Sequence, residues 1–110
     1  MSDTFNLRER QAPLKQQFSD DPSSARATMV VQSVTAPSPD PTRVRVSSEA
    51  GGGVSWDVGA HDLAGGAGDL PCSGDVFLAS LAACQEITIR MVAAAMGIEL
   101  TRLVLTVEGD

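Results

Sequence analysis

The chain has two cysteines, one before its longest apolar stretch and one inside it. Their thiols are the strongest candidate nucleophiles in the sequence. Cys72 stands in PCSGD just before the stretch, and Cys84 stands inside it. Because a helix is predicted from Ser73 to Met96, the two thiols should lie about 18 Å apart along its axis, at roughly 1.5 Å per residue. A disulfide requires Cα atoms within about 7 Å. The two cysteines are therefore not expected to bridge within one chain.

The sequence contains no complete motif for a tyrosine phosphatase, a zinc site or a P-loop. Cys84 and Arg90 have the CX5R spacing of tyrosine phosphatases, but the intervening QEITI has no glycine and continues a helix. His61 is the only histidine and CxxC is absent, which disfavours a zinc site, and the glycine-rich GGGVSW and GGAGD lack the GK[ST] of a P-loop. We therefore expect no metal and no cofactor, and His61 beside Asp62 should be a solvated side chain.

Turn residues, β-branched runs and one long apolar run predict the elements that must position these groups. The long helix is the clearest, because Ser73 suits its N-cap, Asp75 complements the helix dipole in the first turn, and Gly97 suits its end. Pro13 suits the first turn of a shorter helix. The predicted elements are helix 12–18, strands 25–35, 42–49 and 53–59, loop 61–72, helix 73–96 and strand 101–110.

Alternating side chains predict which face of each strand is covered. In the third strand, one face is expected to carry Val54, Trp56 and Val58. In the last strand, one face is expected to carry Leu103, Leu105 and Val107.

Helical spacing places Cys84 in an apolar stripe, so its thiol is expected to point inward. Glu86 and Arg90, one turn apart on another face, form a possible ion pair. Two interpretations of Cys84 stay open: a small apolar filler, a common role of free cysteine, or a shielded nucleophile. The stripe consists of Phe77, Leu81, Cys84, Thr88, Met91 and Ala95.

Composition limits the class of protein. With 110 residues the chain has room for one domain, and 4% aromatic residues predict a thin core of aliphatic side chains. A net charge of -6 with scattered Lys and Arg argues against nucleic acid. The N-terminus lacks the apolar core of a signal peptide, and Gln85, Glu86 and Arg90 interrupt the apolar run, which disfavours a membrane span. We expect a cytoplasmic protein with free thiols.

The stretch SGDVFLASLAACQEITIRMVAAAMGIEL, followed by TRLVLTVEGD, resembles the OsmC/Ohr family of thiol-dependent hydroperoxide reductases. ERQAPLK and CSGD are similar to a subgroup of that family. The resemblance implies an α+β fold in which an antiparallel sheet packs on a long central helix, in an intertwined homodimer. It also implies that residues 1–110 form one OsmC-like domain that stops after the strand following the helix, with 1–22 as an extension containing a short helix.

The same resemblance implies a site and a reaction. Cys84 matches the peroxidatic cysteine, which an arginine activates and a carboxylate at the helix start positions. Asp75 matches the carboxylate of one subgroup, whereas Gly74 stands where others carry glutamate. The motif does not assign the arginine: Arg43 and Arg45, on one predicted strand, are the favoured candidates, and Arg26, just before another, is a further one. The implied substrates are an organic hydroperoxide and an external thiol reductant. The alternative is a non-catalytic dimerisation or small-ligand-binding module, and Cys72 has no assigned role.

Overall fold

The computed structural model describes residues 5–35 and 38–110. Its contacts divide the chain into two compact units, and each is described by itself. Residues 1–27 and 82–106 make up the first, and residues 28–81 and 107–110 make up the second. With two helices and a three-stranded antiparallel sheet, the chain has an α+β composition, as predicted.

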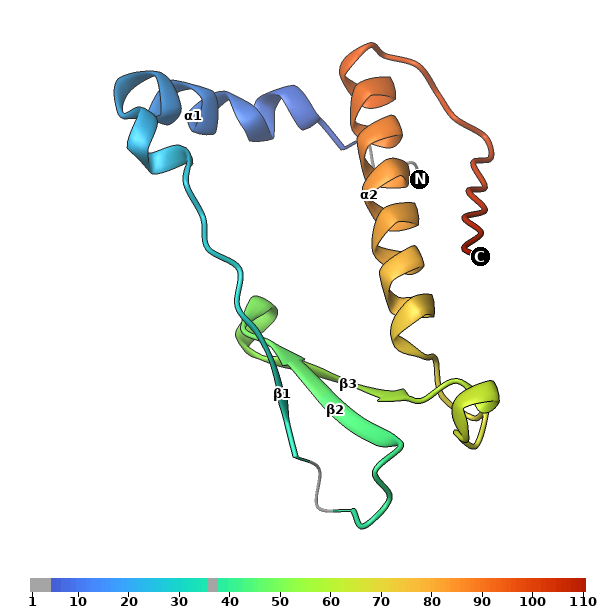
Figure 1. Ribbon diagram of the computed structural model, residues 1–110. Helices are drawn as coiled ribbons and strands as arrows, with labels where there is room; N and C mark the ends of the chain where they lie inside the picture. The colour runs from blue at the N-terminus through green and yellow to red at the C-terminus, as the bar shows by residue number, and fades with distance from the viewer. Residues whose placement is uncertain (1–4, 36–37) are drawn as a thin grey trace. The chain divides into compact units, whose positions relative to one another are not determined.

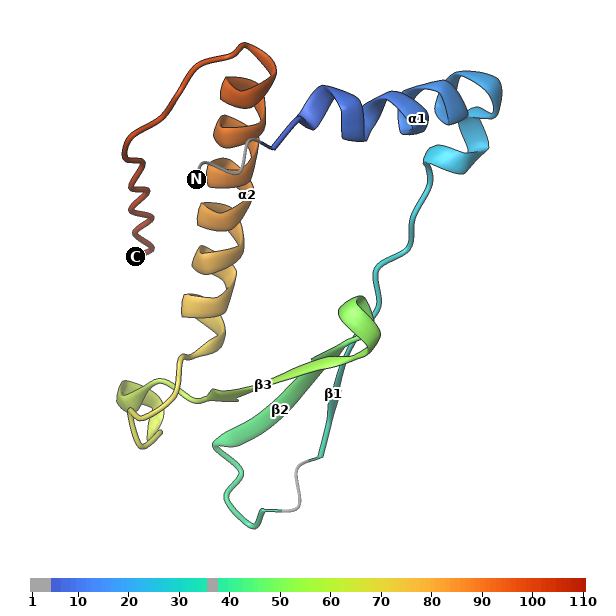
Figure 2. The same cartoon turned by 180° about the vertical axis from the view of Figure 1, so that it is seen from behind.

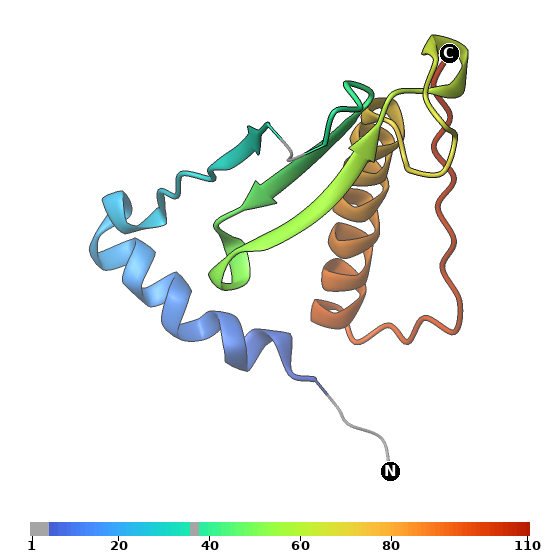
Figure 3. The ribbon, with the colours of Figure 1, turned by 90° about the horizontal axis from the view of Figure 1, so that it is seen from below.

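The sheet is built in chain order from β1 (Val31–Val34), β2 (Arg43–Ser48) and β3 (Val54–Gly59). Both neighbouring pairs are antiparallel, so β2 is the central strand (Figure 3). The second and third predicted strands are confirmed. The first is shorter than the predicted 25–35. Ala25 belongs to a 3₁₀ turn over Pro22–Ala25 that Asp21 caps by accepting from the N–H of Ser23, and the pairing with β2 covers only Val31–Val34.

The faces of β3 follow the predicted alternation. Val58 is buried and Trp56 is half-buried, whereas Ser55 and Asp57 are exposed. Val54, at the start of the strand, belongs to the same face but is exposed.

The first helix, α1 (Leu7–Asp20), is longer than the predicted 12–18. Asn6 caps it by accepting a hydrogen bond of 3.0 Å from the N–H of Glu9, so the helix begins before Pro13. The expectation that Pro13 occupies the first turn was wrong, because Pro13 lies inside the helix. No residue of α1 is buried.

The second helix, α2 (Ser73–Ala95), is the long helix predicted from the sequence (Figure 1). Its first backbone hydrogen bond runs from the N–H of Val76 to the carbonyl of Cys72, so Cys72, not Ser73, is the N-cap. At the other end Gly97 adopts a left-handed φ of 70°, and the N–H of Ile98 donates to the carbonyl of Ala93 at 2.8 Å. This is the Schellman geometry that glycine favours, which confirms Gly97 as the stop.

After Gly97 the chain turns back, and residues 98–106 run along the second half of α2 (Figures 1 and 2). Leu103, Leu105 and Val107 are half-buried and alternate with exposed side chains, as predicted. The predicted strand 101–110 was nevertheless wrong, because the segment pairs with no strand in the part of the chain that the structure describes. The alternation of apolar and polar residues predicts which side chains are covered. A β-strand also needs a neighbouring strand to which its backbone is hydrogen-bonded.

One helix within residues 5–35 and 38–110, α2, is long and apolar enough to span a bilayer by length and composition. The core helix of a soluble protein passes the same test, so this property alone does not make α2 a membrane span.

Candidate functional site

The thiol of Cys84 is exposed on α2, contrary to the expectation that it points inward. The predicted stripe exists as a geometric row, but every member except the half-buried Ala95 is exposed. Phe77 in the same row is 65% exposed. The covered side carries half-buried or buried residues at Leu78, Ala82, Glu86 and Ala93, which lie roughly opposite Cys84 at about 100° per residue.

The sequence does not identify the covered side because α2 has apolar residues on every side. Leu78 and Ala82 are as apolar as Leu81 on the opposite row, so periodicity alone favours neither. The covered side is set by what lies against it: a Cβ at Gly109 would come within 3.2 Å of Leu78. The open row leaves Cys84 accessible to small reagents.

Asp75 stabilises the start of α2. Its carboxylate accepts a hydrogen bond of 3.0 Å from the N–H of Cys72, as the third helical residue does in a capping box. This backbone hydrogen bond, followed by one from the Cys72 thiol, lowers the pKa of Asp75, so the carboxylate is ionised at neutral pH. Asp75 lies about 180° around the helix and roughly 13 Å along it from Cys84, since α2 is continuous between them. Its carboxylate therefore acts on the helix end.

Gly74, in the first turn of α2, has room for a side chain. An added Cβ would meet only the sulfur of Cys72, at 3.5 Å, an ordinary contact. We therefore expect Gly74→Ala to raise the free energy of unfolding by about 0.5 kcal/mol, because alanine restricts the unfolded chain. Thermal denaturation should show a midpoint about 2–4 °C higher. A lower midpoint would mean that the backbone at Gly74 needs glycine.

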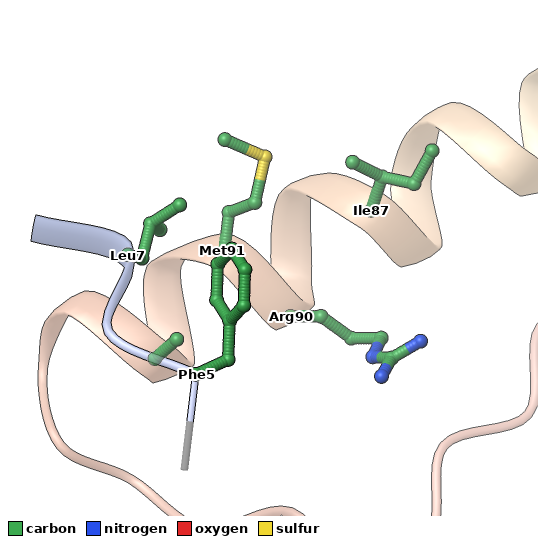
Figure 4. A pocket seen from close by; sticks show the side chains of 6 residues that line it. Phe5, Leu7, Ile87, Arg90 and Met91 are labelled. Carbon is green, nitrogen blue, oxygen red and sulfur yellow. The ribbon is translucent and has the colours of Figure 1, made fainter. Parts of the chain in front are cut away.

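The predicted Glu86–Arg90 ion pair is not formed, since no carboxylate lies within 4.0 Å of Arg90 among the described residues. Arg90 instead lines an open groove of about 310 Å³ in the first unit (Figure 4). Phe5 and Leu7 come from the start of the described chain, and Ile87 and Met91 come from the same side of α2 as Cys84. The guanidinium is the single charged group among otherwise apolar lining residues, which also include Ala94.

Arg43 and Arg45 lie on β2 and each binds a carboxylate. Arg43 binds both oxygens of Asp69 through Nη1, at 2.9 and 2.8 Å. Arg45 binds Asp57 through Nε at 2.8 Å and Nη2 at 3.3 Å. These hydrogen bonds lower the pKa of Asp69 and of Asp57. The structure thus pairs neither arginine with Asp75.

The glycine-rich loop carries Asp69, a residue that the sequence interpretation did not single out. His61 organises the start of this loop, because its Nδ1 accepts from the N–H of Leu63 at 3.0 Å and its carbonyl accepts from Ala64 and Gly66. The acidic GGAGD between two predicted elements was the available signal for Asp69, but a turn aspartate is common and its arginine lies 26 residues away.

Within residues 5–35 and 38–110, no group of three His, Cys, Asp or Glu side chains is placed to hold a metal ion. Cys72 is a half-buried free thiol and Cys84 an exposed one. The continuous helix between them is consistent with the separation that argued against a bridge.

These features describe an α+β protein with a three-stranded antiparallel sheet and a reactive residue type on its long helix. Residues 66–110 match the family model described as OsmC-like protein, which confirms the resemblance over this stretch. The matched stretch contains α2 and both cysteines. No curated protein and no solved structure matches the chain.

Proposed function

We propose that this protein reduces organic hydroperoxides with Cys84 as the nucleophile. The observation that carries the proposal is the OsmC-like match over residues 66–110, in which Cys84 lies on a regular helix with an exposed thiol. An exposed thiol admits both the peroxide and the reductant that must follow it. The proposal assigns the reaction to Cys84 and gives Cys72 a structural role, because Cys72 is the N-cap of α2.

The proposed reaction is a two-electron reduction of the O–O bond. The Cys84 thiolate attacks the distal oxygen of the hydroperoxide, the O–O bond breaks, and the departing alkoxide takes a proton and leaves as the alcohol. Cys84 becomes a sulfenic acid. An external thiol then condenses with it, releasing water and forming a mixed disulfide, and a second thiol restores Cys84 by exchange.

This chemistry requires a cation near the reacting sulfur, because the thiolate is the nucleophilic form. The resemblance assigns that task to an arginine from the N-terminal strands. β2 supplies two, Arg43 and Arg45, and the carboxylate partner of each raises the pKa of its guanidinium. Both side chains therefore stay charged at any pH at which a thiol titrates.

We further propose that two copies associate through large apolar side chains of the open row of α2 and beside it, with Cys84 at the rim of the interface, where its thiol stays open to peroxide and reductant. Large apolar side chains on this row and beside it are exposed, and an exposed contiguous apolar surface is typical of an interface. A homodimer would cover them, and a cytoplasmic setting would keep Cys84 reduced between turnovers. The exposed side chains include Phe77, Leu81, Ile87, Met91 and Val92.

The test compares cumene hydroperoxide consumption by wild type, Cys84→Ser and Cys72→Ser, with dithiothreitol as the reductant. We expect wild type and Cys72→Ser to consume peroxide at similar rates. Cys84→Ser should fall to the rate of the reductant alone, because serine cannot form a sulfenic acid. Dimedone trapping followed by peptide mass spectrometry should place the adduct on Cys84.

Circular dichroism of each variant controls for folding. If Cys84→Ser keeps the wild-type peroxidase rate, or if dimedone labels Cys72 instead, the proposed function is wrong.

The alternative is a non-catalytic module of the same family. Gly74 and the position of Asp75, about 180° around α2 from Cys84, favour it, because no carboxylate of the helix start then faces the thiol. An alkylation rate of Cys84 equal to that of a free cysteine peptide would support this alternative.

A further inference from the structure

The groove beside Arg90 lies entirely within the first compact unit, and the proposed reaction at Cys84 does not use it. Arg90 follows Cys84 by six residues on the continuous helix α2, which places it roughly 9 Å farther along the axis and about 120° around it. Cys84 does not line the groove. The groove is therefore a candidate binding site that is separate from the thiol.

The walls of the groove come from the start of α1 and from one side of α2 (Figure 4). Phe5 directly precedes Asn6, the N-cap of α1, and its ring is held from within the same helix. The guanidinium carbon of Arg10 lies 5.5 Å from the centre of this ring, a distance at which a cation attracts the face of an aromatic ring. The cap and this contact together keep Phe5 in place as one wall of the groove.

Arg90 places a positive charge beside uncovered apolar surface. Phe5 is 60% exposed and Ile87 is 56% exposed, so the apolar walls are open to a ligand. Among residues 5–35 and 38–110, no carboxylate lies within 4.0 Å of the Arg90 guanidinium. A guanidinium matches the geometry of a carboxylate, and the attraction is stronger where apolar groups exclude water. Charge and surface together therefore favour a ligand that is both anionic and apolar.

A second groove of the first unit provides a comparison within the same chain. It has about 370 Å³ and lies between α2 and the segment that follows Gly97. None of its lining residues is charged. Each groove contains one methionine, Met91 beside Arg90 and Met96 in the uncharged groove. The two grooves are thus similar in size and apolar character and differ in charge.

We propose that the groove beside Arg90 binds a small organic anion with an apolar chain, of the chemical class of a medium-chain carboxylate. The carboxylate binds the guanidinium of Arg90, and the apolar chain lies against Phe5, Ile87 and Met91. The volume of about 310 Å³ is at the lower end of small-molecule sites, which favours one small ligand over a protein segment. The ligand is bound without reaction, so the inference does not rest on the proposed peroxidase function.

The test follows the methyl groups of Met91 and Met96 by NMR, in protein labelled with ¹³C-methyl methionine, while sodium octanoate or octan-1-ol is added. We expect octanoate to shift the Met91 signal at a lower concentration than the Met96 signal, whereas octan-1-ol should show no such preference. Arg90→Gln should weaken octanoate binding at Met91 about fivefold, as expected for an ion pair that water partly screens, and should leave octan-1-ol binding unchanged. Arg90→Lys keeps the charge and should recover part of the loss.

The groove shares Ile87 and Met91 with the proposed homodimer interface, so the titration is carried out in the wild type and in Phe77→Asp. Phe77 does not line the groove, and its replacement is expected to separate the copies. Octanoate should therefore bind Phe77→Asp at least as tightly as the wild type. Binding that is found in the wild type and lost in a folded Phe77→Asp protein would assign the site to the interface and overturn the proposal.

Arg102→Gln is the matched control, because it removes the same charge from an exposed position of the first unit that does not line the groove. Its octanoate affinity should equal that of the wild type. Asp3→Asn should also leave the affinity unchanged, and a clear gain would mean that a carboxylate of the chain itself occupies the groove. That gain, equal shifts of Met91 and Met96, or equal effects of Arg90→Gln and Arg102→Gln would each contradict the proposal.

Discussion

Alanine at Gly66 is expected to lower the thermal midpoint of the protein by about 10 °C or more, corresponding to a loss of roughly 2–3 kcal/mol. An added Cβ would overlap the carbonyl oxygen of Ala60 and lie 2.6 Å from its carbonyl carbon. Both are backbone atoms, so no side chain can rotate away. The N–H of Gly66 also donates to the carbonyl of His61 at 3.0 Å, and relief of the overlap would break this hydrogen bond.

Gly74→Ala is the matched control, because it adds the same methyl group where only an ordinary contact results. The two variants should move the thermal midpoint in opposite directions. A Gly66→Ala protein with wild-type stability would show that the loop 61–72 adopts another conformation in solution.

Aspartate at Phe77 is expected to convert the proposed homodimer into monomers. Phe77 lies in the open row of α2 and is 65% exposed in the single chain, so its ring is free to enter an interface. Losing a buried aromatic side chain costs about 1.5–3 kcal/mol, and a two-fold interface loses it twice. The dissociation constant should therefore rise at least about a hundredfold. Sedimentation velocity at micromolar concentration measures the change.

Ala83→Asp is the control for Phe77→Asp, because it places the same charge on an exposed position of α2 outside the row. This variant should remain dimeric. A wild-type protein that sediments as a monomer, or equal dissociation of both variants, contradicts an interface centred on the row.

The sequence predicted those elements whose ends or faces depend only on the residue types within them. Gly97 ends α2 because the left-handed turn favours glycine, and β2 and β3 follow from β-branched alternation. The start of α1 was missed because Pro13 is a familiar first-turn residue, while the cap actually used, Asn6, lies seven residues earlier. A cap is decided by which side chain reaches the free N–H groups.

Features that depend on distant residues could not be predicted. The exposed side of α2 was misjudged because its apolar residues surround the helix, and the segment after Gly97 decides which are covered. Asp69 could not be linked to Arg43, since 26 residues separate them and the hydrogen bond between Gly59 and Pro71, which attaches the loop to the sheet, has no local sequence signal. In the candidate site, sequence reasoning named Cys84, Asp75 and both arginines, but not the partner of either arginine.

Asp75 and Asp69 stabilise different parts of the chain, so a substitution of one leaves the contacts of the other in place. One carboxylate holds the helix start through Cys72, and the other holds a guanidinium on the sheet. Replacing Asp75 would remove a contact of the helix start, and Arg43 would still keep its hydrogen bonds to Asp69. In a chain where one acid performed both tasks, a single substitution would remove the helix cap and the partner of the arginine together.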